Sequence, residues 1–276
     1  MVEKIEKILV AVAGRGLCEE MVNMLRETPA IQQASITVLH VVSEEVSADA
    51  MAEKLEEGGK ILAQAVKSLK VDPSKVKPRL KQGDAKTIVC DIAQEEDTDL
   101  IIMGSRALGR LLSILENSVS QYVFQLADRP MLLVKDETYV KRLRRIMVAL
   151  DTSEEAKQSL QLALFLARGL KELQLVLAHV NPPDPQASPE TDPVLSAAAS
   201  EAKKLGISYR CITSTGKAGP EICRLAEENN ADLLVLGSPD RRPSIAKTLP
   251  DLDRLLGGSR SDYVRVHADC PVLLVR

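Results

Sequence analysis

Residues 257–262, GGSRSD, place glycines and hydroxyl groups directly before a stretch with a helical pattern. The first backbone N–H groups of a helix have no partner within the helix and carry partial positive charge, so such a turn can bind an anion such as phosphate. Gly258 would let the main chain approach a ligand closely, and the Ser259 hydroxyl could contact a phosphate oxygen. Alternatively, Ser259 only caps the helix, as serine often does. The local sequence leaves both interpretations open.

The elements that must position this turn follow from short apolar runs. LIIMG (100–104) and LLVLG (233–237) are apolar at consecutive positions, as in parallel strands that are covered on both faces. Strand–helix alternation predicts right-handed crossovers and a doubly wound sheet, which binds ligands at the carboxyl ends of its strands. In the first half of the chain, the predicted strands lie near 8–13, 35–42, 77–81, 99–104 and 130–134, and the predicted helices near 16–27, 48–70, 85–96 and 117–127.

The same pattern occurs twice along the chain. ILVAVA (8–13) corresponds to IMVALD (146–151), and IVCDIAQEEDTDLIIMGS (88–105) corresponds to EICRLAEENNADLLVLGS (221–238). Such self-similarity indicates a duplicated unit. We therefore predict two α/β domains, 1–137 and 143–276, joined by a polar and charged linker, each built on a five-stranded parallel sheet.

Each copy resembles the universal stress protein family over nearly its whole length. The resemblance implies two doubly wound domains of the adenine nucleotide alpha hydrolase-like type. In nucleotide-binding members of this family an Asp closes the first strand, a Gly-x-x-Gly follows the fourth, and Gly-Ser or Gly-Thr opens the last helix. The resemblance implies that the Asp and the main chain after the second strand hold adenosine, and that the glycine-rich turn holds phosphates.

In the second copy, the resemblance places Asp151 at the acidic position and Val180 after the second strand. Gly237 and Gly258 match the outer glycines of the phosphate motif, whereas Asp240 stands where the inner glycine is expected. We expect ATP or another adenine nucleotide, with or without Mg²⁺, to bind here. The predicted binding residues are Asp151, Thr152, Ser153, Val180, Gly237, Ser238, Arg241, Gly258, Ser259, Arg260 and Ser261.

The loop between the two halves of this motif, 239–257, is longer than its counterpart in the first copy. Its basic residues, Arg241, Arg242 and Lys247, could supply positive charge to phosphates. Its aspartates would oppose phosphates unless a divalent ion intervened. We expect a bound nucleotide to set the conformation of this loop and so to regulate a protein partner. Alternatively, the segment is a solvated loop.

The first copy carries a weaker version of the motif. Ala13 replaces the acid, Ala107 replaces the inner glycine, and Asn117-Ser118 replaces Gly-Ser. Asn still caps a helix well, so the fold tolerates that change. Because Ala13 offers no carboxylate to a sugar hydroxyl, we expect weak or absent nucleotide binding in this copy.

Composition excludes several classes of function. Hydrophobic residues make up 45% of the chain, aromatic residues only 2%, and the net charge is −3. A broad nucleic-acid or membrane surface would need clustered basic residues, and base stacking would need aromatic side chains. The five cysteines contain no CxxC pair, and no run is long enough to span a membrane. We predict a cytoplasmic protein that binds no nucleic acid and does not insert into a membrane.

Other residues at matching positions have less specific interpretations. His40 and His179 are predicted to bond to the backbone at strand ends, with a metal site as the alternative. Cys90 and Cys223 are predicted to be small buried hydrophobic residues, and His267 to lie on the surface or at the rim of the site.

Three functions remain open at this stage. The first is a nucleotide-binding stress regulator that is not an enzyme. The second is an interaction or scaffold module that binds no nucleotide and could be the soluble regulatory part of a transporter. The third is a slow ATPase. The apolar last strands, 130–134 and 271–275, are expected to pair and form an internal pseudo-dimer, or to support a homodimer.

Overall fold

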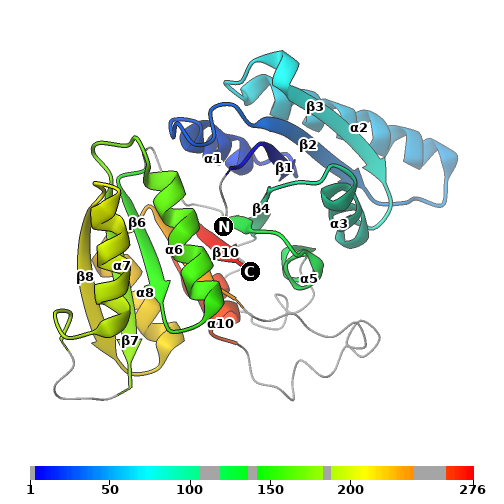
Figure 1. The fold of residues 1–276 in the computed structure, drawn as a ribbon. Helices are drawn as coiled ribbons and strands as arrows, with labels where there is room; N and C mark the ends of the chain where they lie inside the picture. The colour runs from blue at the N-terminus through cyan, green and yellow to red at the C-terminus, as the bar shows by residue number, and fades with distance from the viewer. Residues whose placement is uncertain (1–3, 106–118, 136–141, 183–187, 239–258) are drawn as a thin grey trace. The chain divides into compact units, whose positions relative to one another are not determined.

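The computed structural model describes residues 4–105, 119–135, 142–182, 188–238 and 259–276 (Figure 1). The chain divides at residues 137–138 into two compact units, and each unit contains one copy of the repeated sequence. We call them the first and the second repeat. Both are α/β structures with parallel strands, as predicted.

The first repeat has the strand order β3-β2-β1-β4-β5, with all neighbours parallel. Its described elements are β1 (Lys7–Ala11), α1 (Leu17–Leu25), β2 (Ser35–Val42), α2 (Ala48–Ser68), the 3₁₀ helix η1 (Pro73–Lys75), β3 (Val76–Gln82), α3 (Ala85–Glu95), β4 (Leu100–Ser105), α5 (Val119–Leu126) and β5 (Met131–Lys135).

The second repeat has the equivalent order β8-β7-β6-β9-β10, again with parallel neighbours. Its described elements are β6 (Arg145–Leu150), α6 (Glu154–Ala167), β7 (Gln174–Asn181), α7 (Pro193–Lys204), β8 (Ser208–Thr215), α8 (Ala218–Glu228), β9 (Leu233–Gly237), α10 (Arg260–His267) and β10 (Val272–Val275). The expected pairing of the two repeats through their last strands stays a prediction.

The strands and helices predicted for the first copy are confirmed, with small shifts at their ends. One such shift concerns β1, which ends at Ala11 rather than Ala13. Gly14 and Gly16, with φ of 78° and 77°, take the chain through a left-handed turn into α1. Glycine adopts this conformation without the steric penalty that a Cβ atom brings.

Helices cover both faces of each sheet, which explains why the central strands are apolar throughout. In the second repeat, α6 packs on β6, β7 and β9, while α8 and α10 pack together (Figure 1). Leu234 and Val235 of β9 are completely buried, as are Ile101 and Ile102 of β4. Burial on both faces is typical of parallel strands in doubly wound sheets.

The strand order reverses beside the first strand of each repeat. β6 lies between β7 and β9, and the crossover from β6 to β7 runs in the opposite direction from the one that reaches β9. Ligands of doubly wound sheets bind at such a switch point, outside the carboxyl ends of the strands. The topology therefore predicts a ligand site at the carboxyl ends of β6 and β9.

In both repeats an aspartate anchors a strand at the opposite end of the sheet, where the strands begin. The Asp232 carboxylate accepts hydrogen bonds from the backbone N–H groups of Arg144 (2.8 Å) and Arg145 (2.7 Å). Its counterpart, Asp99, accepts equivalent bonds from Glu6 and Lys7. Each aspartate, just before β9 or β4, thus holds the start of the neighbouring strand.

Candidate functional site

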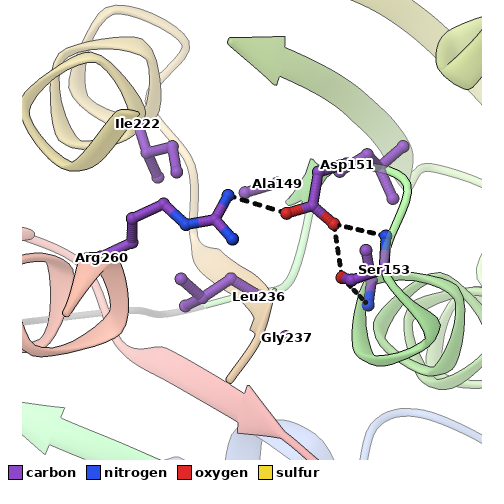
Figure 2. Close-up of a pocket in the computed structure, with 9 residues that line it drawn as sticks. Ala149, Asp151, Ser153, Ile222, Leu236, Gly237 and Arg260 are labelled. Carbon is purple, nitrogen blue, oxygen red and sulfur yellow. Dashed lines mark hydrogen bonds and ion pairs between the residues drawn. The ribbon is translucent and has the colours of Figure 1, made fainter. Parts of the chain in front are cut away.

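A small pocket, open to solvent, lies at the carboxyl ends of β6 and β9 (Figure 2). The first turns of α6 and α10 border it, and Ile222 of α8 forms part of its wall. This is the topological switch point of the second repeat. The residues that line the pocket are Ala149, Leu150, Asp151, Ser153, Ala156, Ile222, Leu236, Gly237 and Arg260.

Asp151 directly follows β6 and is held by a local turn. Its Oδ1 atom accepts hydrogen bonds from the Ser153 backbone N–H, at 2.8 Å, and from the Ser153 hydroxyl. The Ser153 hydroxyl also caps α6, because it accepts a bond from the Ala156 N–H at 3.2 Å. Ser153 is the N-cap residue of α6, so one serine orients both the helix and the carboxylate.

The second oxygen of Asp151 faces Arg260. The Arg260 guanidinium donates from Nη1 to Asp151 Oδ2 at 2.7 Å, and Figure 2 shows its side chain reaching across the pocket. Burial raises the pKa of Asp151, but the bonds from Ser153 and the charge of Arg260 outweigh burial. The pKa of this carboxyl therefore lies below its ordinary value, and the group is ionised at neutral pH.

Three serine hydroxyl groups form a hydrogen-bonded chain at the start of α10. Ser259 is the N-cap residue, since its Oγ accepts a bond from the Asp262 N–H at 3.1 Å. Ser261 shares hydrogen bonds with both Ser259 (2.9 Å) and the buried Ser238 (2.8 Å). This chain of hydroxyls ties the end of β9 to the first turn of α10, so the predicted helix start at Ser259 is confirmed.

The structure brings together four of the predicted site residues as pocket lining: Asp151, Ser153, Gly237 and Arg260. Ser238, Ser259 and Ser261 lie behind or beside them in the hydroxyl chain. Thr152 is exposed. Arg241 and Gly258, together with the 239–257 loop, lie outside the described residues.

Val180 differs from the expectation in its position. We predicted it after the second strand, but β7 continues to Asn181 and Val180 pairs with Ser214 of β8. The strand is longer because β8 runs beside it to Thr215. Val180 is half-buried and does not line the pocket.

Sequence reasoning missed the apolar wall of the pocket. Ala149, Leu150 and Leu236 are the last apolar residues of β6 and β9, so their place beside Asp151 and Gly237 was a usable signal. Ile222 comes from α8, and its repeat pattern alone gave no sign that it would reach the pocket. An apolar wall beside a few polar groups is the usual composition of a small-molecule site.

The equivalent loop of the first repeat is built differently. Ala13, which stands for Asp151, is exposed. A Cβ atom on Gly14 would lie 3.4 Å from the Ile61 side chain, so this loop runs close beside α2. The first repeat therefore lacks the carboxylate that defines the pocket of the second.

The histidines and cysteines at matching positions of the two repeats do not all have the environments that the sequence predicts. His40 Nδ1 is hydrogen-bonded to the backbone carbonyl of Val12 at 2.8 Å, as predicted. The prediction is wrong for His179, whose Nδ1 contacts the Asp192 carboxylate at 2.7 Å, because Asp192 caps α7 next to it. Cys90 and Cys223 are half-buried rather than buried, since their helices face solvent on one side.

His267 ends α10 and is exposed, as predicted, with its ring beside that of Tyr263. Within the described ranges, no group of His, Cys, Asp and Glu residues has the arrangement of a metal site. No helix in the same ranges is long and apolar enough to cross a bilayer.

The model of the universal stress protein family matches this chain twice, over residues 4–135 and 142–276. The chain belongs to the universal stress protein family. A universal stress protein of the cyanobacterium Synechocystis sp. is 36% identical over 104 residues, which cover 34% of this chain and 66% of that protein. The matched part is thus just under two thirds of that relative's length.

Solved structures agree on the tandem fold of this family member. A universal stress protein from Archaeoglobus fulgidus superposes with a TM-score of 0.77 at 21% identity, covering 98% of this chain and 96% of that one. A protein of unknown function from Pseudomonas aeruginosa gives 0.63 at 19% identity, covering 98% and 92%. Both likenesses concern the whole fold, including its two repeats.

Proposed function

We propose that this universal stress protein binds an adenine nucleotide in its second repeat and acts as a nucleotide-dependent regulator rather than as an enzyme. The observation that carries the proposal is the ionised Asp151 carboxylate, held in a pocket between the ends of β6 and β9 and opposite the first turn of α10. The carboxylate can accept hydrogen bonds from ribose hydroxyls. The apolar residues beside it suit a planar base, and the N-terminus of α10 suits phosphate.

On this proposal each chain has a single nucleotide site, because the first repeat has no carboxylate at the equivalent position. Ala13 cannot accept a hydrogen bond from a sugar through its side chain, and its loop is packed near Ile61. A cytoplasmic location and a protein partner that responds to the nucleotide belong to the same proposal.

The experiment begins with denaturing mass analysis of freshly purified protein for released adenylates. Thermal melts with added ATP and Mg²⁺ follow. A ligand at about 100 times its dissociation constant stabilises its domain by about 2.7 kcal/mol, which shifts the melting temperature by a few degrees. Asp151→Ala should abolish both the released adenylate and the shift.

Asp72→Ala is a matched control for the local turn. Asp72 accepts bonds from the backbone N–H (2.9 Å) and the hydroxyl (2.8 Å) of Ser74, two residues on, as Asp151 does from Ser153, but it lies on the surface of the first repeat. It should leave nucleotide binding unchanged. Equal affinity in the wild type and Asp151→Ala would contradict the proposal.

A second candidate, an interaction module that binds no nucleotide, is favoured by one observation. Both oxygens of the Asp151 carboxylate already have partners within the chain, Ser153 at Oδ1 and Arg260 at Oδ2. The same experiment separates the two functions, since an interaction module would release no adenylate and would show no thermal shift.

A further inference from the structure

Arg260 and Asp151 lie on opposite sides of the pocket and are 109 residues apart in the sequence. The side chain of Arg260 is 56% exposed and that of Asp151 is 27% exposed. Exposed ion pairs contribute little to stability, so this pair can exchange partners at small cost. Oδ1 of Asp151 is engaged by Ser153, so a ligand hydroxyl would meet Oδ2, the oxygen that Arg260 contacts.

The two members of the pair are absent together from the first repeat. Ala13 stands for Asp151, and Val119, which follows Ser118 as Arg260 follows Ser259, stands for Arg260. At these two positions the second repeat therefore has both charges and the first repeat has neither. This is the pattern expected if the cation is useful only where the carboxylate and its pocket exist.

The position of Arg260 is electrostatically unusual. It is the first residue of α10, where the helix dipole places partial positive charge and disfavours a cation. The Asp151 carboxylate, which accepts a bond from the guanidinium, offsets this charge. A phosphate at the same helix terminus would be attracted by the positive end of the helix dipole and by the guanidinium together.

We infer that Arg260 is a specificity-determining residue that pairs with Asp151 and, when a nucleotide binds, transfers to a phosphate of that nucleotide. The ribose then takes over Oδ2 of Asp151. On this basis the site selects phosphorylated over unphosphorylated nucleosides. The inference rests on the proposed function and adds a residue role to it.

The test is isothermal titration of the full chain with adenosine and with AMP. Three proteins are compared: the wild type, Arg260→Gln, and Arg210→Gln, which removes the same charge from an exposed position on β8. Arg260→Gln should lower the preference for AMP over adenosine by about tenfold, the effect of losing one charge-assisted hydrogen bond. It should not weaken adenosine binding, because it also removes the competitor for Asp151. Arg210→Gln should keep the wild-type preference.

The outcomes distinguish the inference from the proposed function. If the wild type binds AMP and Arg260→Gln weakens AMP and adenosine by the same factor, the inference is overturned and nucleotide binding stands. If the wild type prefers adenosine, the inference is likewise overturned. If the wild type binds neither compound, both the inference and the proposed function fail.

Discussion

Gly237, the last residue of β9, lies directly against the backbone of Glu155 in the first turn of α6. A Cβ atom at residue 237 would be 2.6 Å from the carbonyl carbon of Glu155 and 2.8 Å from the amide nitrogen of Ala156. The equivalent glycine of the first repeat, Gly104, has room among the described residues: the nearest of their atoms to its Cβ would be the Val134 carbonyl oxygen, at 4.0 Å. The same position is thus constrained by packing in the second repeat and not in the first.

Gly237→Ala should therefore destabilise the second repeat, because backbone rather than a flexible side chain would have to move. We expect a loss of about 1–3 kcal/mol in the free energy of unfolding, as for other overpacked sites. Urea denaturation measures the effect, with Gly104→Ala as the matched control. A smaller effect of Gly237→Ala than of Gly104→Ala would show that packing against α6 is not the reason for this glycine.

Asp99→Ala and Asp232→Ala should each destabilise their own repeat. Each removes a carboxylate that accepts two backbone N–H bonds at the start of a central strand. We expect a loss of about 1.5–3 kcal/mol for each substitution, as for hydrogen bonds to a charged group. Thermal unfolding of the two single variants and the double variant measures it. Asp269→Ala, at an exposed position, serves as the control and should change little.

Acid should weaken the second repeat through Asp192. Burial raises the pKa of this carboxyl, but hydrogen bonds from Asn181 and His179 bring the pKa below its ordinary value of 3.8. A carboxyl with a lowered pKa in the folded state stabilises the fold above its unfolded pKa, and this contribution is lost as the pH falls through the folded pKa.

Stability should thus decrease below about pH 4, and Asp192→Asn should flatten this part of the profile. Urea denaturation at a series of acidic pH values measures both, with Asp269→Asn as the control for charge. An unchanged slope in Asp192→Asn would assign the acid sensitivity to other groups.

The contact between α8 and α10 should show strong coupling between Gly219 and Tyr263. A Cβ atom on Gly219 would lie 2.9 Å from Cδ1 and 3.0 Å from Cβ of Tyr263. Gly219→Ala should be destabilising in the wild type. In the Tyr263→Ala background the contacts with the ring are removed and only the contact with Cβ at 3.0 Å remains. The same substitution should therefore be less destabilising there than in the wild type, since alanine also has the better helix propensity. A double-mutant cycle measures the coupling, and purely additive effects would contradict it.

Much of the fold was predictable from the sequence because its signals are local. Consecutive apolar residues mark strands covered on both faces, and serine before a helical pattern marks a cap. Accordingly β9 ends at Gly237, and α6 and α10 begin after Ser153 and Ser259. The duplication of these signals predicted the two repeats. The expected carboxyl ends of the strands, now β6 and β9, predicted where the pocket lies.

The sequence by itself determined the order of the elements, the two repeats and the location of Asp151 at the end of a central strand. Only the tertiary structure decided which side chains meet. Arg260 contacts Asp151, His179 contacts Asp192 instead of the backbone, and Ile222 reaches the pocket from α8. The physical reason is that strand and cap patterns arise from neighbours along the chain, whereas these contacts depend on how separate helices pack on the sheet.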